Sequence, residues 1–321
     1  MKKHCIGIVI RNRLELTRNT LMGLYYSDQN KSDYDVFLID NASDHQTRDE
    51  LKKFAAGGIL PVKNLYVLKE EAPIASAWNL FLALSQKYEY RTKLDNDMVM
   101  LRTVTPPASG HQRDNVNKPF PSEIDPLGGA PRSGAVVGGV NSITSRIQRP
   151  SVSIYNDTEK YNMAHSKFLD HMEYFATDNE VDLMALVPVP AKQTFQDASF
   201  AAHNKQVNGR SCLMGGCMMI SKRTFDTVGY FDERFHRRID IEYSQRAVKL
   251  GLNLGYHPNY WAVHTGANQS TENEAQKQEK TAQANLLLQQ DLPSTKISSH
   301  WHDIIYKVAT ASKNNKIVNL K

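Results

Sequence analysis

The chain contains 321 residues, of which 40% are hydrophobic and 23% are charged, and it carries a formal net charge of +5 at pH 7. This composition is typical of a soluble globular protein that buries a full core in one large or two modest domains. The mildly positive charge suits an anionic substrate or partner.

The cysteines and the apolar runs argue against several other classes of protein. Cys5, Cys212 and Cys217 form neither a disulfide framework nor a zinc-binding pattern, so we expect a reducing, cytoplasmic location. The first apolar run stops at Arg11, which is too short for a signal peptide. The apolar, uncharged stretch 211–221 falls short of the roughly 20 residues that a membrane span needs.

The first hundred residues alternate between short β-branched runs and amphipathic helical patterns. The expected strands are 5–10, 34–43, 64–70 and the stretch that ends in "KLDND", and the expected helices are 17–27, 45–56 and 74–86. This alternation predicts an α/β fold, in which helices cover a mostly parallel sheet and ligands bind at the carboxyl ends of its strands.

The chain changes character after this region. Residues 103–134 are rich in proline and glycine, which indicates a long polar loop. We expect a strand at 135–143 and a helix at 162–176. Residues 268–290 are strongly helix-prone, and the basic segment 312–321 is expected to be loosely held.

Asp40 closes the second expected strand in "FLIDNASD". A carboxylate at this point can accept hydrogen bonds from a nucleotide base or a ribose hydroxyl. The alternative is a local turn or a helix cap, because the following residues are rich in Asn, Ser and Asp.

Asp95 and Asp97 follow the fourth expected strand in "KLDNDMVM". Carboxylates suit Mg²⁺ or Mn²⁺, which take one or two of them and complete their coordination with water and phosphate oxygens. A turn with two solvated acids is the alternative. His264, at the end of the apolar stretch "NYWAVH", is either a structural histidine or a further ligand of this metal.

A second acidic pair, Asp240 and Glu242, opens an expected helix in "RRIDIEYSQR". Acidic residues at a helix start interact favourably with the helix dipole, which is sufficient to explain them. The functional alternative is a general base that removes the proton from an attacking hydroxyl. Gly215 and Gly216, which precede a buried strand, permit a close backbone approach.

Taken together, these segments resemble a family-2-type glycosyltransferase with the GT-A fold, a mixed, mostly parallel sheet flanked by helices. The motifs occur in the family's order and are "IVIRNR", "LIDNASDHQT", "EEAPIASAWNLFLALS", "LDNDMVM", "GGCMMISKRTFDTVGYFDERF", "RIDIEYSQR" and "YHPNYWAVH". They cover roughly 5–100 and 212–266. The implied organisation is a catalytic domain at 1–266, an acceptor-side insert within it at about 102–211, and a helical extension with a basic tail at 267–321.

The resemblance implies a role for each matched residue. The nucleotide-sugar would be bound by Ile10, Arg11, Asn12, Arg13, Asp40, Asn79, Lys93, Asp95 and Asn96. A Mn²⁺ or Mg²⁺ ion on the diphosphate would be held by Asp95, Asp97 and His264. The acceptor side would be formed by Gly215, Gly216 and Arg238, with Asp240 as the general base.

The implied reaction is inverting transfer of a hexose or pentose to an acceptor hydroxyl, with a UDP-sugar as the expected donor. The acceptor oxygen would attack the anomeric carbon while the metal offsets charge on the leaving diphosphate. The expected acceptor is a saccharide or glycoconjugate, or a hydroxylated DNA base as in phage-type DNA modification. A positive face suited to such a polyanion is expected from the insert, His236–Arg238 and the basic tail.

Two alternatives stay open at the level of sequence. A nucleotidyltransferase would use the same strand-end acids, but its glycine- and lysine-rich phosphate loop is missing from 8–20. A non-catalytic nucleotide-sugar-binding protein is the second alternative, because Ile239 replaces the glutamate that precedes the base in the family pattern. A further departure is Pro73, which replaces a glycine of the third motif.

Overall fold

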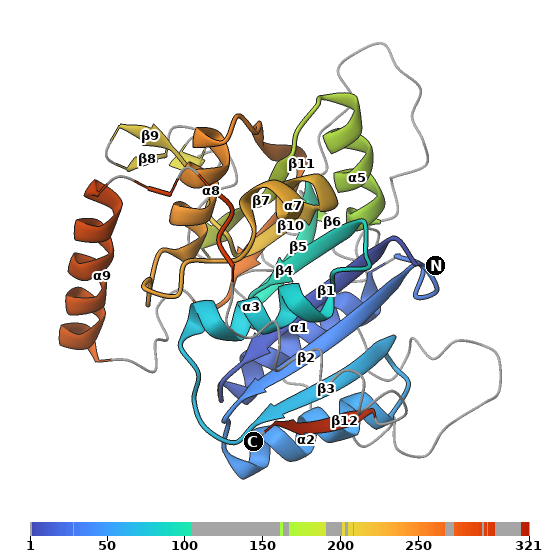
Figure 1. Ribbon diagram of the computed structural model, residues 1–321. Coiled ribbons are helices and arrows are strands. Elements are labelled where there is room, and N and C mark those ends of the chain that lie inside the picture. The colour runs from blue at the N-terminus through green and yellow to red at the C-terminus, as the bar shows by residue number, and fades with distance from the viewer. Residues whose placement is uncertain are drawn as a thin grey trace.

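The centre of the fold is a 10-stranded mixed sheet in the order β12-β3-β2-β1-β4-β10-β7-β11-β5-β6, accompanied by a two-stranded sheet of β8 and β9. Figure 1 shows the strands of the large sheet side by side, with helices on both faces. The computed structural model describes residues 2–27, 29–103, 161–162, 167–190, 201–202, 205–207, 209–266, 273–290, 292–293, 295–298 and 316–320.

The strands are β1 (His4–Ile10), β2 (Tyr34–Asn41), β3 (Val62–Leu68), β4 (Tyr90–Leu94), β5 (Met98–Thr103), β6 (Tyr161–Asn162), β7 (Leu183–Pro190), β8 (Gln206–Val207), β9 (Arg210–Ser211), β10 (Cys217–Ser221), β11 (Leu254–His264) and β12 (Ile317–Leu320). The helices are α1 (Leu14–Tyr26), α2 (His45–Ala56), α3 (Ile74–Leu84), α5 (Phe168–Asp178), α7 (Lys222–Val228), α8 (Ile239–Lys249) and α9 (Glu274–Gln289).

One half of the sheet is parallel, which brings several strand ends to the same edge. Strands β12, β3, β2, β1 and β4 pair with one another in parallel. Strand β10 then runs antiparallel to both β4 and β7, and β11 runs parallel to β7 but antiparallel to β5. The carboxyl ends of β1, β2 and β4 therefore lie together, beside the end of β11.

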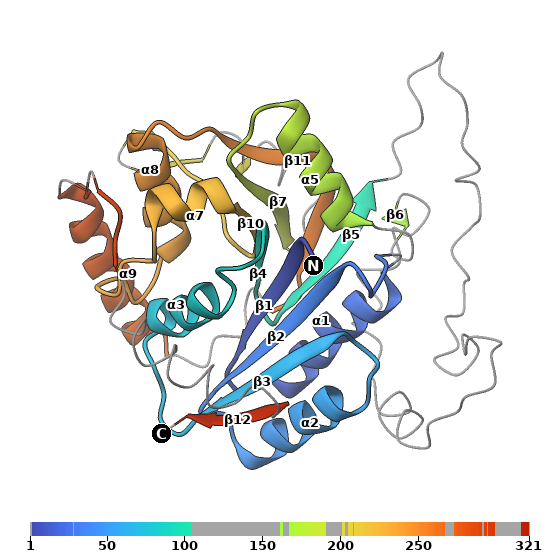
Figure 2. The same cartoon turned by 45° about the vertical axis from the view of Figure 1, so that its right-hand side comes forward.

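Side chains of each strand alternate between two apolar layers, as the pleat of a strand requires. On one face, Cys5 and Val9 of β1 belong to a core with α3, α7 and α8. On the other face, Ile6 and Ile8 belong to a core with α1, α2 and α5. Figure 2 shows the helices of these two layers on opposite sides of the sheet. All seven residues of β1 are buried, which explains the apolar run rich in β-branched residues at 5–10.

The expected order of strands and helices in the first hundred residues is confirmed. Helix α1 begins at Leu14, earlier than the expected residue 17. Asn12 and Arg13 have positive φ angles of 54° and 56°, and this left-handed turn leads directly from β1 into the helix. The fourth expected strand divides into β4 and β5, so Asp95 and Asp97 lie in the turn between them.

Later elements agree less closely with the expectations. The helix expected at 162–176 is α5 and begins at Phe168. Within the helix-prone region 268–290, residues Glu274–Gln289 form α9, whose start is fixed by a capping box between Asn273 and Gln276. The strand expected at 135–143 and most of the long polar loop lie outside the described residues.

The loosely held basic tail is a wrong prediction for its described residues. Strand β12 pairs in parallel with β3 along its whole length, with Ile317 opposite Leu65. Val318 and Leu320 are buried in the larger core, because this apolar pair faces inward while Asn319 faces solvent. The division expected at 267 stays a prediction, although β12 joins the sheet of the preceding residues. None of the described helices is long and apolar enough to cross a membrane.

A half-buried carboxylate, that of Asp35, ties the start of β2 to the segment between α3 and β4, and its titration is expected to affect stability. Tyr88 donates a hydrogen bond to Asp35, which also lies 3.0 Å from the Nζ atom of Lys2. Burial alone would raise the pKa of Asp35, but the hydrogen bonds from Tyr88 and Lys2 outweigh it and hold the pKa below its ordinary value.

Asp35→Asn is therefore expected to cost about 1–2 kcal/mol of unfolding free energy near neutral pH. Because the folded-state pKa is the lower one, this contribution is present above the unfolded-state pKa of about 4 and is lost as pH falls through the folded-state value. Urea unfolding of both proteins between pH 6 and pH 3 measures it. A difference between the two proteins that stays constant over that range would contradict the assignment.

Candidate active site

The residues singled out in the sequence gather at the edge where the parallel strands end. Ile10 and Asp40 are paired neighbours at the ends of β1 and β2. Strand β4 ends one residue before Asp95. His264 ends β11 and lies opposite Met98, the first residue of β5, so it is brought next to the turn between β4 and β5.

Asp97 and His264 are in direct contact. The Nε2 atom of His264 lies 3.1 Å from Oδ2 of Asp97, and a guanidinium nitrogen of Arg13 lies 2.9 Å from the same oxygen. Thr265 donates both its backbone N–H and its hydroxyl to the carbonyl oxygen of Asp97, at 2.9 Å and 2.8 Å. The side chain of Asp97 is only 6% exposed, whereas that of His264 is 32% exposed. The pair thus forms a buried carboxylate with a half-buried imidazole in front of it.

The charges of this cluster support one another. Burial by itself would raise the pKa of Asp97, but the hydrogen bond with His264 and the charges of His264 and Arg13 lower it below its ordinary value. Burial would lower the pKa of His264, and the contact with Asp97 raises it instead. The carboxylate of Asp97 is therefore ionised at neutral pH and is available as a ligand for a cation.

Arg13 reaches this cluster from the left-handed turn that follows β1. Its guanidinium donates to the carbonyl oxygen of Gly266 at 3.1 Å as well as to Asp97. A Cβ atom on Gly266 would overlap both the Arg13 guanidinium and the Asp97 carboxylate. The segment after β11 therefore packs against the cluster as closely as a glycine allows.

A second cluster links the acids of the two halves of the chain. The ammonium group of Lys93 lies 2.5 Å from Oδ1 of Asp95, 2.6 Å from the carbonyl oxygen of Gly215 and 4.7 Å from the ring centroid of Trp78. Gly215 in turn donates its N–H to Oδ2 of Asp240 at 2.7 Å. Asp95 and Asp240, from motifs far apart in the sequence, are thus joined through one lysine and one glycine.

The metal ligands expected from the sequence are only partly brought together. No group of three or more His, Cys, Asp or Glu side chains within the described part of the chain is arranged to hold a metal ion. Asp97 and His264 form the expected pair, but Asp95 is directed to Lys93. Asp95 as a metal ligand is thus not supported by this geometry. Two protein ligands are nevertheless sufficient for Mn²⁺ or Mg²⁺, which complete their coordination with water and substrate phosphate.

Asp40 takes the structural role that the sequence offered as the alternative. Its side chain is fully buried and accepts hydrogen bonds from the N–H of Ser43 and from Nε of Arg48, both at 2.9 Å. Asn12 adds a second link to this turn, because its N–H donates to the Ser43 hydroxyl and its amide oxygen accepts from the N–H of Asp44. Asp40 therefore orders the turn after β2 and presents no free surface to a nucleotide.

Asn79 is also structural in this arrangement. It is fully buried in α3, where its amide group donates to the carbonyl oxygen of Phe231 and its amide oxygen accepts from the N–H of the same residue, at 3.0 Å and 2.8 Å. Glu233 accepts a further hydrogen bond from it at 2.9 Å. Asn79 thus binds the loop before α8 to α3.

The other residues expected on the donor side lie at the same edge with mixed exposure. Ile10 is fully buried, so any contact with a nucleotide would come from its backbone. Arg11 is partly exposed and forms an ion pair with Glu71. Asn96, in the turn between β4 and β5, donates its amide to the Thr17 hydroxyl at 3.0 Å. Of these side chains, that of Arg11 is the most accessible to an anionic ligand.

The acceptor-side residues are divided in the structure. Gly216 accepts a hydrogen bond from the N–H of Asp95 at 2.8 Å and so belongs to the site. Arg238 has a positive φ of 59° at the start of α8 and donates to the side-chain oxygen of Asn285 in α9 at 2.5 Å. Arg238 therefore fastens α9 to the start of α8.

Sequence reasoning missed a buried ion pair behind Asp240. Glu242 and Arg246 are both fully buried, one turn apart in α8, with Nε of Arg246 2.5 Å from Oε1 of Glu242. Arg246 also donates to the carbonyl oxygens of Val228 and Tyr230. The i,i+4 spacing of the two residues was the available signal, although it is usual for exposed pairs as well.

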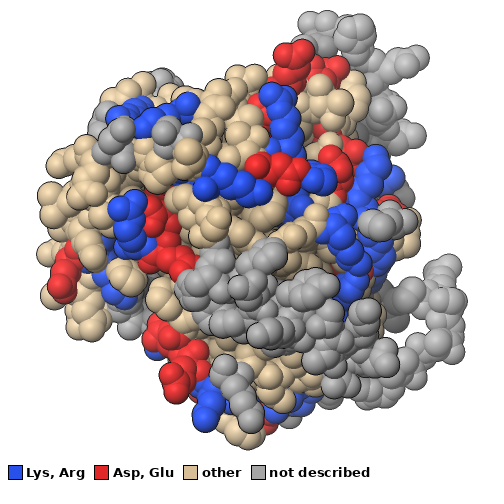
Figure 3. Space-filling view, viewed as in Figure 1, with Lys and Arg blue, Asp and Glu red and all other residues tan. Residues whose placement is uncertain are grey.

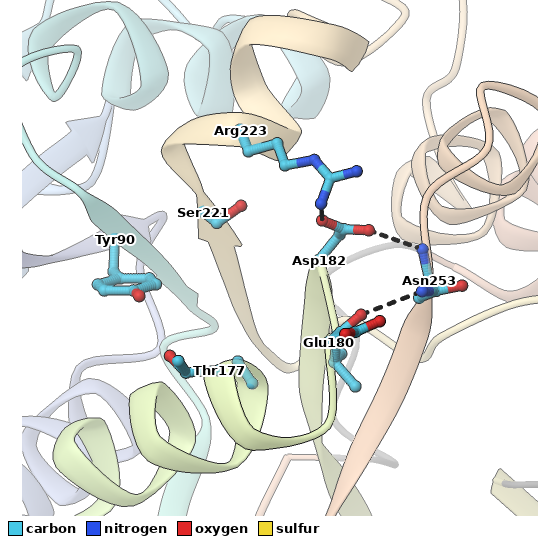
Figure 4. Close-up of a pocket in the computed structure, with 9 residues that line it drawn as sticks. Tyr90, Thr177, Glu180, Asp182, Ser221, Arg223 and Asn253 are labelled. Carbon is cyan, nitrogen blue, oxygen red and sulfur yellow. Dashed lines mark hydrogen bonds and ion pairs between the residues drawn. The ribbon is translucent and has the colours of Figure 1, made fainter.

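A cavity of about 480 Å³ lies at the opposite ends of these strands. Figure 4 shows Asp182 between Arg223 and Asn253, with Tyr90 and Glu180 also on the wall. Arg223 lies 3.1 Å from Asp182, which also accepts the N–H of Asn253 at 3.0 Å. None of the site residues expected from the sequence lines this cavity. It is therefore separate from the edge where the candidate site residues gather.

Comparison with known proteins establishes the fold. No protein-family model matches the sequence. No curated protein matches it either. Among solved structures, the chain is similar to S. aureus TarS, with 13% identity over 92% of this chain and 41% of that chain and a TM-score of 0.50. This chain thus spans less than half the length of the full TarS structure.

Two structures with bound ligands show the same similarity. TarS 1-349 in complex with UDP-GlcNAc matches with 13% identity over 92% of this chain and 68% of that chain, at a TM-score of 0.50. The mannosyltransferase PcManGT from Pyrobaculum calidifontis, in complex with GDP-Man and Mn²⁺, matches with 13% identity over 97% of this chain and 69% of that chain, at a TM-score of 0.54. The chain therefore has the α/β GT-A fold, as the resemblance of its sequence motifs implied.

Proposed function

We propose that the chain is a metal-dependent, inverting glycosyltransferase that moves a sugar from a nucleoside diphosphate to an acceptor hydroxyl. The observation that carries the proposal is the contact between Asp97 and His264, 3.1 Å apart at the carboxyl edge of a GT-A sheet. The similar structures support a nucleotide-sugar donor, because they contain UDP-GlcNAc in one case and GDP-Man with Mn²⁺ in the other.

The donor set favours Mn²⁺ over Mg²⁺. Asp97 offers a carboxylate oxygen and His264 an imidazole nitrogen, whereas Mg²⁺ prefers a shell of oxygen atoms alone. The bound metal would offset the negative charge that develops on the leaving diphosphate. Asp97 is held in place for this task by Thr265 and Arg13.

Asp240 is the proposed general base. One of its oxygens accepts the N–H of Gly215, and among the described residues its Oδ1 has no hydrogen-bond partner. That oxygen is therefore available to an acceptor hydroxyl. The acceptor oxygen would form a bond to the anomeric carbon as the bond from that carbon to the diphosphate breaks. The acceptor proton would pass to Asp240 and the nucleoside diphosphate would leave with the bonding electron pair, which inverts the anomeric carbon.

The proposed acceptor is a saccharide or glycoconjugate. Figure 3 shows Lys and Arg side chains beside Asp and Glu side chains across the described part of one face. A polyanion such as DNA would be favoured by a continuous positive surface, which the described part of that face does not form. Arg238, expected to contribute positive charge, is held by a hydrogen bond to the neutral side chain of Asn285.

The direct test is a thermal-shift panel of UDP, GDP, CDP and ADP with and without Mn²⁺. A ligand at 100 times its Kd stabilises the folded protein by about 2.7 kcal/mol, which gives a measurable rise in Tm. We expect one nucleotide to stabilise the chain only in the presence of Mn²⁺. The proposal fails if none of them produces a metal-dependent shift.

Asp97→Asn is expected to weaken Mn²⁺-dependent nucleotide binding by about 10²-fold or more, because it removes the charged ligand of the ion. Isothermal titration calorimetry of the nucleotide in the presence of Mn²⁺ measures the change. Asp226→Asn serves as the matched control, since Asp226 forms an exposed ion pair with Lys222 on α7. Unaltered affinity in Asp97→Asn would remove Asp97 from the metal site.

A further inference from the structure

Lys93 uses all three N–H directions of its ammonium group inside the protein. It is only 4% exposed in β4 and contacts Asp95, the carbonyl oxygen of Gly215 and the face of Trp78. An ammonium group has three donors and no acceptor, and cation–π contact uses the third direction here. Lys93 is therefore surrounded by partners within the protein, whereas its expected role was a direct contact with the nucleotide-sugar.

Gly215 connects Lys93 to Asp240 by two hydrogen bonds. Its carbonyl oxygen accepts from Lys93 at 2.6 Å, and its N–H donates to Asp240 at 2.7 Å. A Cβ atom at Gly215 would lie 2.5 Å from the Cβ of Asp240, which no side chain tolerates. The next residue, Gly216, accepts the N–H of Asp95 at 2.8 Å. The glycine turn is thus fastened on one side to the acids after β4 and on the other side to the start of α8.

The positive charge of Lys93 also favours this arrangement of Asp95 and Asp240. The ammonium group of Lys93 lies 2.5 Å from the carboxylate of Asp95, and the carboxylate of Asp240 is bound to the same glycine turn. Without this cation, the carboxylates of Asp95 and Asp240 would repel one another across the glycine turn. Lys93 thus holds together groups that would otherwise move apart.

We infer that Lys93 is a positioning residue, which sets the place of the Asp240 carboxylate relative to the donor through Gly215. This inference rests on the proposed function, because Asp240 is the base of that reaction. A base displaced by about 1 Å loses on the order of 10² in rate without any loss of donor affinity. A donor-binding role would differ, because substitution of a donor-binding residue would lower the affinity for the donor before it lowered the rate.

The test compares Lys93→Met, Lys93→Arg and Gly215→Ala with the unaltered chain. Gly215→Ala moves the turn without removing a charge, so it remains informative if Lys93→Met folds poorly. Lys63→Met is the matched control, because Lys63 pairs with Asp35 at the other end of the sheet. Hydrolysis of UDP-GlcNAc and of GDP-Man with Mn²⁺ is followed by release of the nucleoside diphosphate, with water as the acceptor.

We expect Lys93→Met and Gly215→Ala to lower kcat by about 10²-fold while the KM for the donor changes less than about threefold. Lys93→Arg, which keeps the positive charge, should recover part of the lost rate, and Lys63→Met should keep the full rate. A tenfold rise in KM at constant kcat would make Lys93 a donor ligand and overturn the inference. Unchanged kinetics in both Lys93→Met and Gly215→Ala would overturn it as well.

Amide hydrogen exchange tests the positioning role of Lys93 without an assay of the proposed reaction. The N–H groups of Gly215 and Asp95 are protected by hydrogen bonds to Asp240 and Gly216. Lys93→Met should increase amide exchange in peptides that cover 93–97 and 213–217, and Lys63→Met should not. This result would support the positioning role even if the unaltered chain hydrolyses neither donor, an outcome that would count against the proposed function. Unchanged exchange in Lys93→Met would overturn the inference whether or not the chain is active.

Discussion

Asp240→Asn is expected to lower the rate of sugar transfer by about 10²–10⁴-fold, the usual contribution of a general base. Asparagine has nearly the same shape as aspartate, and its amide oxygen can still accept the N–H of Gly215. The amide cannot take a proton from the acceptor hydroxyl. Nucleotide binding should therefore stay within about threefold of the original affinity, because the contacts of Asp97 and His264 are unchanged.

The measurement combines release of nucleoside diphosphate with calorimetric titration of the nucleotide in the presence of Mn²⁺. Asp226→Asn provides a control with the same chemical change on an exposed helix surface. Transfer by Asp240→Asn at the original rate would show that another group is the base. Loss of nucleotide affinity together with rate would place Asp240 on the donor side instead.

Arg246→Met is expected to lower the free energy of unfolding by about 3–5 kcal/mol. Arg246 and Glu242 are both fully buried, so removal of the cation leaves an ionised carboxylate without its partner in the core. The carbonyl oxygens of Val228 and Tyr230 also lose their donors. Each unsatisfied buried group adds to the loss.

The pH dependence of this loss has a definite sign. Burial already raises the pKa of Glu242 against the effect of Arg246. In Arg246→Met the carboxyl group should protonate at still higher pH, since its positive partner is absent. A group whose pKa is raised on folding stabilises the folded state at low pH, so the loss should be largest near neutral pH and should shrink as pH falls through that raised value.

Urea unfolding at two pH values tests both the size and the sign. The double substitution Glu242→Leu with Arg246→Met should recover much of the stability, because no buried charge is left unpaired. Arg223→Met removes an arginine that is 72% exposed and should change the unfolding free energy by less than about 1 kcal/mol. A similar loss in Arg223→Met and Arg246→Met would show that burial of the ion pair is unimportant.

The sequence by itself was sufficient for the order of strands and helices in the first hundred residues, although not for the start of α1 or for the division between β4 and β5. Residues 5–10 lie in β1 because an apolar run rich in β-branched residues suits a strand that is buried on both faces. Residues 45–56 form α2, which Asp44 caps by accepting the N–H of Thr47. Such signals are local, since each depends on neighbours within a few positions along the chain.

The sequence was also sufficient to find the acids at the strand ends, but not their partners. Asp97 and His264 were expected at one site, and the antiparallel pairing of β11 with β5 brings them together. Asp95 was expected at the same metal, yet it binds Lys93. The side chains of Asp40 and Asn79 turned inward to Arg48 and Phe231.

Only the tertiary structure decided these roles, and the physical reason is the same in each case. A carboxylate, an amide or an ammonium group binds whichever complementary group lies within about 3 Å, and packing of distant segments selects that group. Gly215 meets Lys93 and Asp240 because β10 pairs with β4 while α8 packs beside it. The tail strand β12 joined β3 for a comparable reason, since this pairing buries its apolar side chains Val318 and Leu320. Residue type and order thus determined which chemistry the chain carries, and the fold determined which side chains are free to perform it.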